Sequence, residues 1–168
     1  AATIEHWPSL LSQSVWTVAA MLAGFLTAAA VAIPLAMLIV VSPVLERLIY
    51  PPMVATQSIP KIALAPLFIV WFGFGATPKV AVAFLIAFFP VVVDTIVGLR
   101  SIDPAMIQLA RSMGAPPHRI FLKLRFPNAL PSVFAGLKVA SALAVVGTLT
   151  GEFIGSDRGL GYLLLQAT

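Results

Sequence analysis

Few side chains in this sequence are of a type that could do chemistry, and they form two groups. Two carboxylates, Asp94 and Glu152, occur in or beside long apolar segments, where an ionisable group usually has a functional role. The second group is basic and is concentrated in the polar stretch 101–131: Arg111, Arg119, Lys123 and Arg125. Isolated carboxylates and clustered cations are suited to binding polar or charged partners rather than to breaking bonds.

The sequence motifs of the common enzyme classes are absent. There is no H-E-x-x-H, no G-x-S-x-G and no G-x-x-x-x-G-K-[ST] phosphate loop. His6 and His118 fall on opposite sides of a membrane if the basic stretch is cytoplasmic, so they cannot form a metal or catalytic pair. The absence of cysteine excludes disulfides and cysteine-ligated zinc. We therefore expect no catalysis, no metal, no cofactor and no ATP binding by this chain itself.

The composition is that of a membrane protein. Hydrophobic residues make up 60% of the chain and charged residues 10%, with a mean hydropathy of +1.04. A soluble domain carries about 25% charged residues, so this chain has too few charges to cover a surface in water. The net charge of +4 would also fit a nucleic-acid partner. The basic residues, however, collect beside apolar segments, as the positive-inside rule expects, and we expect no nucleic-acid binding.

Apolar segments long enough to cross a bilayer predict an all-α bundle. A core of about 30 Å needs about 20 apolar residues in a helix. Three segments meet that length: 14–41, 79–99 and 129–154. A fourth, 62–74, is short and contains Pro66, so it can cross only as a broken or tilted helix together with 58–61. We treat residues 1–168 as one transmembrane domain, and expect a further helix before residue 1 and completion of the last helix after 168.

The broken segment is our first candidate for lining a pathway, since the freed carbonyls of a broken membrane helix need protein or a water-filled cavity. Pro66 and Trp71 represent it, and a merely kinked packing helix is the alternative. Asp94 and Glu152 complete the pathway candidates. For Asp94 the alternative is a place near the membrane interface, or a pair with Arg100.

Charge asymmetry predicts the orientation. If the basic stretch is cytoplasmic, alternation of the spans puts the connector 42–61 on the same side. The inner side then holds Arg47, Lys61, Arg100, Arg111, Arg119, Lys123 and Arg125. Only Lys79 and Arg158 remain outside, which is the bias that the positive-inside rule describes.

The first half of the polar stretch predicts a short amphipathic helix. Ser101 or Asp103 can cap its start, Pro104 suits its first turn, and Gly114 can end it in the left-handed conformation. Four apolar side chains recur at helical spacing on one face: Met106, Leu109, Ala110 and Met113.

The second half predicts another short helix. Pro116 and Pro117 allow it to begin and Pro127 stops it. We thus expect two amphipathic helices joined by a Gly-Ala-Pro-Pro corner and tethered to spans at both ends. The alternative is a solvated loop with a basic face. A DNA-binding helix-turn-helix can be read into residues 108–124, but the tethers would prevent groove entry.

These residues resemble a known family. The order A-R-x-x-G-A, then F-P-x-A-L-P about a dozen residues later, is similar to the EAA loop of ATP-binding-cassette (ABC) importer permeases. Gln108 stands where that pattern has Glu and Leu109 where it has the first Ala, whereas Ala110 and Gly114 match. Further matches, over about 10–168, are similar to the sulfonate, taurine and nitrate branch: Ile59-Pro60, Ala65-Pro66-Leu67, Trp71 to Gly75, Phe89-Pro90, Gly98-Leu99-Arg100, Gly151-Glu152-Phe153 and Gly159-Leu160-Gly161-Tyr162.

The resemblance implies a type I ABC importer permease in a bacterial inner membrane, crossed several times. Such a chain forms the pathway for a small solute, here a sulfonate, taurine or nitrate-like anion, with a thiamine precursor or riboflavin as the alternative. The implied partners are a second copy of the chain, two cytoplasmic ATPase subunits that hydrolyse ATP, and an extracytoplasmic substrate-binding protein. The residues expected to couple to the ATPase are Met106, Gln108, Leu109, Ala110, Arg111, Met113, Gly114 and Ala115.

A channel or secondary transporter is the alternative class. It would also be apolar and would also use broken helices. It would not need two amphipathic helices in one cytoplasmic loop, and it would not associate with an ATPase.

Overall fold

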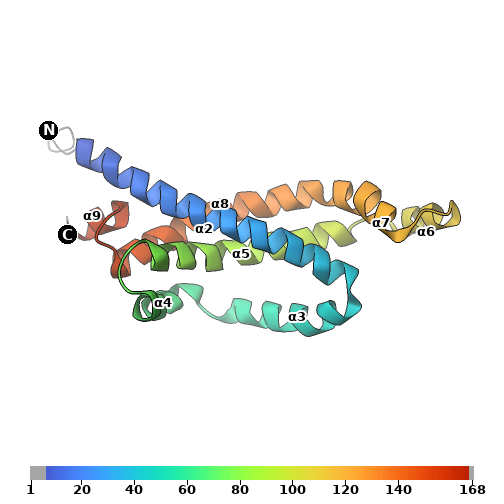
Figure 1. The fold of residues 1–168 in the computed structure, drawn as a ribbon, viewed down its shortest axis with the longest axis horizontal. Coiled ribbons are helices and arrows are strands. Elements are labelled where there is room, and N and C mark those ends of the chain that lie inside the picture. Colours follow the sequence, from blue (N-terminus) through green and yellow to red (C-terminus); the bar gives the residue numbers. More distant parts are fainter. Residues whose placement is uncertain (1–6, 167–168) are drawn as a thin grey trace.

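The computed structural model describes residues 7–166, and within that range the chain is helical apart from short connections (Figure 1). The elements in chain order are α2 (Trp7–Val41), α3 (Pro43–Ala55), η1 (Thr56–Ser58), η2 (Lys61–Leu64), α4 (Ala65–Phe72), α5 (Ala76–Arg100), α6 (Pro104–Ser112), α7 (Pro117–Ile120), the π-helical turn η3 (Phe121–Arg125), α8 (Phe126–Gly155) and α9 (Leu160–Gln166). The all-α fold class is confirmed. Predictions for residues 1–6, His6 among them, and for 167–168 lie outside the described residues.

Three long helices, α2, α5 and α8, form the bundle and run along its long axis (Figure 1). Helical stretches long and apolar enough to cross a membrane are Ser9–Val41, Ala76–Arg100 and Pro117–Gly155. These agree with the three long segments predicted from the sequence. The termini of the described chain lie together at one end of the bundle, and α6 and α7 extend beyond the other end.

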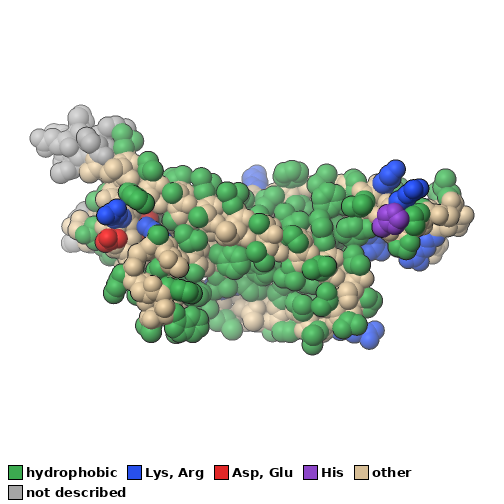
Figure 2. All heavy atoms as spheres, in the orientation of Figure 1, with side chains coloured by type: hydrophobic (Ala, Val, Ile, Leu, Met, Phe, Trp, Pro, Cys, Tyr) green, Lys and Arg blue, Asp and Glu red, His purple; other side chains and the backbone are tan. Residues whose placement is uncertain are grey.

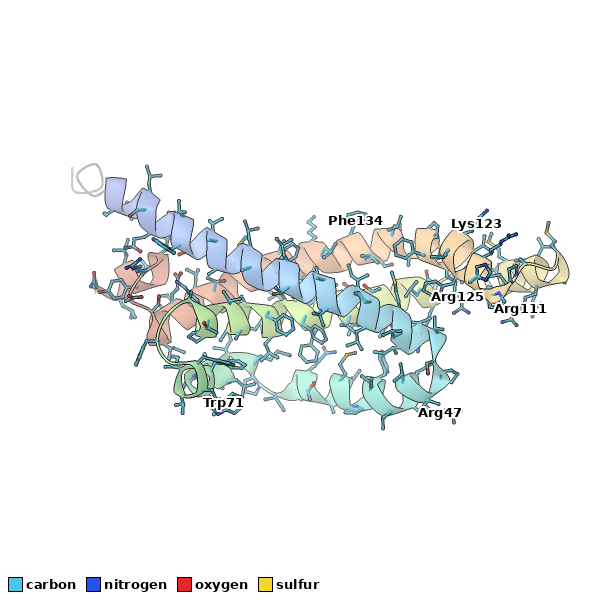
Figure 3. The ribbon with its side chains drawn as sticks, viewed as in Figure 1. Arg47, Trp71, Arg111, Lys123, Arg125 and Phe134 are labelled. Atoms are coloured by element: carbon cyan, nitrogen blue, oxygen red, sulfur yellow. The ribbon has the colours of Figure 1, made fainter. Side chains whose placement is uncertain are left out.

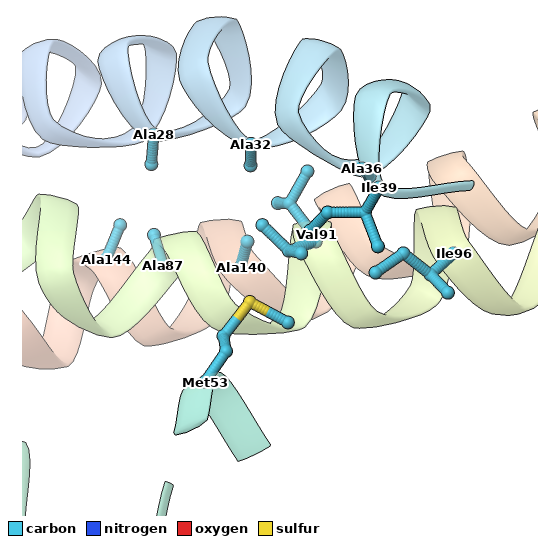
Figure 4. Packing of buried hydrophobic residues seen from close by; sticks show 11 residues of the cluster. Ala28, Ala32, Ala36, Ile39, Met53, Ala87, Val91, Ile96, Ala140 and Ala144 are labelled. Atoms are coloured by element: carbon cyan, nitrogen blue, oxygen red, sulfur yellow. The ribbon is translucent and has the colours of Figure 1, made fainter. Parts of the chain in front are cut away.

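Small side chains allow the three helices to approach closely. One fully buried cluster joins them (Figure 4): Ala28, Ala32, Ala36, Ala87, Ala140 and Ala144. Gly24 lies so near α5 that a Cβ added to it would be 2.6 Å from the Ala83 Cβ. A Cβ on Gly147 would be 2.9 Å from the Ala83 Cα. Small residues at crossings are how helices associate in lipid, where there is no hydrophobic drive between them.

The fourth apolar segment is broken, as predicted. Pro43–Ser58 and Lys61–Phe72 together are long and apolar enough for one broken span or a re-entrant loop, and they are bent by 91° at the break between them. Pro66 lies in the first turn of α4, where its missing N–H costs nothing. The break is therefore at Ile59-Pro60, where the backbone is extended.

The segment 42–60 was predicted as a connector, part of it helical, on the basic side; it is helical over most of its length, and its placement at the basic side was wrong. The segment forms α3, which runs back along the bundle (Figure 1). Arg47 stays at the basic end (Figure 3), whereas Lys61 lies beside α5. The Lys61 Nζ lies 4.5 Å from the ring centroid of Phe89, which is in the middle of α5.

Pro127 does not end the second short helix, contrary to prediction. The chain stays helical from Pro117 to Gly155. A proline normally clashes with the carbonyl four residues earlier. Here the preceding turn, Phe121–Arg125, is π-helical, and the Phe126 N–H donates to the Phe121 carbonyl five residues back. The wider turn accommodates the ring, so α7, η3 and α8 form one continuous helix.

Charges separate along the bundle. Figure 2 shows Lys and Arg side chains gathered at the end that carries α6 and α7, while hydrophobic side chains cover most of the length. Lys79 and Arg158 meet at the opposite end, where the Lys79 Nζ donates to the Arg158 carbonyl at 3.3 Å. Their separation from the basic end agrees with the predicted orientation.

Candidate functional site

The helix α6 is built and closed as its sequence predicts. The Asp103 carboxylate caps the start by accepting the Ala105 N–H at 2.8 Å, and Pro104 occupies the first turn. At the end, the Gly114 N–H donates to the Arg111 carbonyl at 2.9 Å and the Ala115 N–H to the Ala110 carbonyl at 3.0 Å. This pair of bonds is a Schellman motif, which needs the first residue after the helix cap to adopt the left-handed backbone conformation. Gly114 supplies it with φ of 76°.

The apolar face of α6 is open. Met106 is 52% exposed, Leu109 64% and Met113 79%, while Ala110 is half-buried. No described part of the chain covers these three long side chains. Gln108 and Arg111 are also exposed, on other faces of the same helix. The solvated-loop alternative is not what the structure shows, because an ordered, doubly capped helix presents the stripe.

A cavity of about 510 Å³ lies at the break of the fourth apolar segment. Polar side chains that line it are Gln57, Lys61 and Asp94, and its apolar wall includes Phe89. We call it the break cavity. It combines an amide, a cation and a carboxylate in an otherwise apolar wall, which is the composition of a site for a small polar solute. Gln57 and Lys61 were missed at the sequence level, since their segment was read as a connector.

Asp94 is half-buried at this cavity and faces α8. A Cβ added to Gly136 would lie 2.8 Å from the Asp94 Cβ, so glycine makes room for the carboxylate. The predicted alternative of a pair with Arg100 was wrong, because Arg100 bonds Glu46 at 2.6 Å. Within residues 9–166, Asp94 has no ion pair.

Pro66 and Trp71 are not brought to the break cavity. Pro66 is exposed at the start of α4. Trp71 is 64% exposed on the same short helix (Figure 3) and packs edge-on against Phe68, with ring centroids 6.2 Å apart. The segment does line the cavity, but through its residues near the break.

Glu152 lies elsewhere, in a buried polar network at the end opposite to the basic loop. Its Oε1 is 3.5 Å from the Lys79 Nζ, and the two side chains are 0% and 4% exposed. The Thr17 hydroxyl donates to Oε1 at 2.9 Å, and the Gly161 N–H donates to Oε2 at 2.9 Å. The network thus joins α2, α5, α8 and the start of α9. Thr17 and Lys79 were not predicted as members of this network. The motif Gly159-Leu160-Gly161-Tyr162, which resembles the permease pattern, was a sequence signal at this place.

Closely packed glycines shape this network. A Cβ on Gly151 would lie 2.7 Å from the Lys79 Cα, and one on Gly161 would lie 2.8 Å from the Glu152 Cβ. A Cβ on Gly159 would overlap the Glu152 carboxylate. The motifs G-E-F and G-L-G therefore describe one contact: glycines from the turn and helix α9 close over a buried glutamate.

Comparison with known proteins identifies the family. Residues 20–168 match the family described as "Binding-protein-dependent transport system inner membrane component". The chain belongs to this family. The permease family is one of transport rather than catalysis, and it is a family of the inner membrane, which agrees with several helices able to cross a bilayer. The predicted resemblance to ABC importer permeases is confirmed.

Individual relatives carry several substrate names. The chain is 47% identical over 117 residues to the formylaminopyrimidine transport permease protein ThiX of Halalkalibacterium halodurans, covering 70% of this chain and 47% of that one. It is 42% identical over 120 residues to the riboflavin transport system permease protein RibX of Chloroflexus aurantiacus, covering 71% and 45%. It is 33% identical over 144 residues to the putative aliphatic sulfonates transport permease protein SsuC of Bacillus subtilis, covering 86% and 52%. The chain spans about half the length of these curated relatives.

Proposed function

We propose that this chain is the membrane-spanning part of an ABC importer permease, and that α6 couples it to a cytoplasmic ATPase. The observation that carries this is the open stripe of Met106, Leu109 and Met113 on a helix that projects beyond the bundle (Figure 1). A contiguous exposed apolar patch marks an interaction site. Because the stripe lies at the basic end, beyond the lipid-covered length, its partner is a protein in the cytoplasm.

The remaining predicted coupling residues have distinct parts in this proposal. Ala110 borders the stripe and contacts the ATPase beside it, whereas Gln108 and Arg111 lie on other faces of α6 and have no part in the stripe itself. Gly114 and Ala115 hold the corner that fixes the direction of α6 relative to α7. ATP binding then shifts the permease between inward- and outward-facing states, to the extent that the closed ATPase pair has different affinity for the two. Hydrolysis belongs to the ATPase, since the chain has no phosphate loop.

Association with the ATPase tests the coupling proposal. The full-length permease is co-expressed with its ATPase, and a variant changes Met106, Leu109 and Met113 to Asp. The control is Ser112→Asp, which adds a charge to α6 away from the stripe. We expect the triple variant to insert but not to co-purify with the ATPase, and the control to co-purify. Co-purification of the ATPase with the triple variant would contradict the proposal. If no ATPase co-purifies with the wild type, a channel or secondary transporter is favoured.

The break cavity is our candidate for the solute pathway, in a permease formed by two copies of this chain and fed by an extracytoplasmic binding protein. Its support is the polar lining by Gln57, Lys61 and Asp94 at the break of the fourth apolar segment. Asp94→Asn should lower solute uptake while ATPase association is kept. Asp157→Asn, the same change at a 76% exposed side chain outside the cavity, is the control. Equal uptake by both variants would remove Asp94 from the pathway.

Three substrate classes are supported by the names of relatives, and riboflavin, from RibX, is one of them. A sulfonate or taurine-like anion follows from the motifs and from relatives such as SsuC. An aminopyrimidine vitamin precursor is supported by the higher identity to ThiX. Uptake of a labelled alkanesulfonate, of a labelled formylaminopyrimidine and of labelled riboflavin by cells carrying the full system separates the three.

A further inference from the structure

A second cavity of about 510 Å³ lies at the basic end of the bundle. The end of α2 contributes Val41 to its wall, and α6 contributes Ile107 and Arg111. The continuous helix of α7 and η3 contributes Phe121 and Arg125, together with His118. We call it the basic cavity. Its surface is almost entirely apolar, and Arg111, His118 and Arg125 are the basic residues among those that line it.

The cations of the basic cavity have no anionic partner within residues 9–166. Neither Arg111 nor Arg125 forms an ion pair there. The nearby carboxylates are already engaged, because Glu46 bonds Arg100 at 2.6 Å and Asp103 caps α6. Arg125 is also half-buried. Arginines placed together without a carboxylate select an anion from outside the chain, and guanidinium geometry favours phosphate.

The basic cavity and the coupling stripe are on different faces of α6. Successive residues of an α-helix are about 100° apart around its axis, so Ile107 and Arg111 lie about 150° from the centre of the stripe. A ligand in the basic cavity therefore leaves Met106, Leu109 and Met113 free for the ATPase. The cavity faces back toward the bundle, where α2 ends at Val41.

The basic cavity lies at the end of the first membrane-capable stretch, where hydrocarbon would give way to water if that stretch crosses a bilayer. Val41 is the last residue of the first membrane-capable stretch and is 64% exposed, and Leu122 of the cavity wall is 61% exposed. A ligand here meets apolar side chains on the membrane side and guanidinium groups at the surface. An anionic phospholipid has that distribution, with acyl chains below a phosphate, and basic pockets between helices on the cytoplasmic side bind such headgroups.

We propose that the basic cavity binds the headgroup of an anionic phospholipid, with Arg111 and Arg125 on its phosphate and Val41 and Phe121 against its acyl chains. The site ties α6 to the membrane surface and to the end of α2. It adds a membrane ligand to the permease and is independent of which solute is carried.

Lipid retention tests the proposal without any transport measurement. The full-length permease, in complex with its ATPase, is purified in detergent with equimolar phosphatidylglycerol and phosphatidylcholine, and bound lipid is counted by native mass spectrometry. The test variant is Arg111→Gln with Arg125→Gln. The matched control is Arg119→Gln with Lys123→Gln, which removes the same charge at the same end of the bundle. Figure 3 labels Lys123 at the same end as Arg111 and Arg125, but neither Lys123 nor Arg119 lines the cavity.

The wild type should retain phosphatidylglycerol in preference to phosphatidylcholine. The test variant should bind phosphatidylglycerol about 100-fold more weakly, since each direct hydrogen bond to a charged phosphate contributes a factor of about ten or more. The control pair should stay within a few fold of the wild type, and Arg111→Lys with Arg125→Lys, which keeps the charge, should restore most of the binding. Equal loss in the control pair would mean a diffuse charge effect and would overturn the site.

Two other results would also overturn it. One is a wild type with no preference for phosphatidylglycerol. The other is displacement of the lipid by excess inorganic phosphate alone, which would mean that the cavity selects free phosphate and makes no use of its apolar wall. Thermal unfolding of each variant in detergent checks that the protein is folded when its lipid binding is measured.

Discussion

Replacing Glu152 with Gln should destabilise the bundle far more than its conservative chemistry suggests. The change keeps the shape of the side chain and its capacity to accept the Gly161 N–H. It removes the negative charge that lies 3.5 Å from the Lys79 Nζ. Both side chains are at most 4% exposed, so water cannot replace the lost partner.

The size of the effect follows from that burial. Removing one member of a buried ion pair typically costs about 3–5 kcal/mol, because the other charge is left uncompensated. Lys79 keeps two weaker bonds, to the Ser156 hydroxyl at 3.4 Å and the Arg158 carbonyl at 3.3 Å. We therefore expect the lower end, about 3 kcal/mol.

A double-mutant cycle isolates the pair. Lys79→Met alone should also cost about 3 kcal/mol, by leaving the carboxylate unpaired. Lys79→Met with Glu152→Gln has no buried charge and should cost about 1–2 kcal/mol in total, so the two single effects should be strongly non-additive. Equilibrium unfolding in mixed micelles measures all three. Single costs below about 1 kcal/mol, or additive costs, would refute the reasoning that the buried pair holds these helices together.

Two further changes probe the other sites. Gly114→Val forces a β-branched residue to φ of 76°, which costs about 1–2 kcal/mol although the new side chain meets no clash. The variant should uncouple transport from hydrolysis without impairing insertion. Normal transport by this variant would contradict the coupling role. Gly136→Ala puts a Cβ 2.8 Å from that of Asp94, and it should lower the free energy of unfolding by about 1–3 kcal/mol and reduce uptake. The control Ala135→Val, at an exposed position, should do neither. Equal melting temperatures for these two variants would show that α5 and α8 are not closely packed there.

Local signals in the sequence predicted local structure well. The α6 helix is an example, because its start at Asp103 and its corner at Gly114 depend only on neighbouring backbone groups. The three long spans were also predicted, since length and a low density of charge suffice to identify them. Charge asymmetry correctly separated Lys79 and Arg158 from the basic end.

Prolines were the main source of error in predicting elements. The segment predicted as a connector forms α3, which contains Pro51 and Pro52, and Pro127 suggested an end where a π-helical turn lets the helix continue. A soluble helix would be broken at such positions, but helices in membranes tolerate proline when neighbouring groups and local adjustments satisfy the backbone. The extended Ile59-Pro60 was the true break.

Tertiary contacts were beyond the sequence pattern for a different reason. A helix that is apolar on all sides gives no periodicity to show which face meets which neighbour. The bonds of Glu152 to Thr17 and Lys79 join residues of three such helices, and the approach of Lys61 to Phe89 depends on the 91° bend.

The central claim, that the α6 stripe couples this permease to ATP hydrolysis, is tested most directly by ATPase activity. The full-length permease and its ATPase are reconstituted in lipid with and without the binding protein, beside the variant with Met106, Leu109 and Met113 changed to Asp. We predict hydrolysis that the binding protein stimulates in the wild type and not in the variant, although both insert equally. Stimulation that persists in the variant would contradict the account.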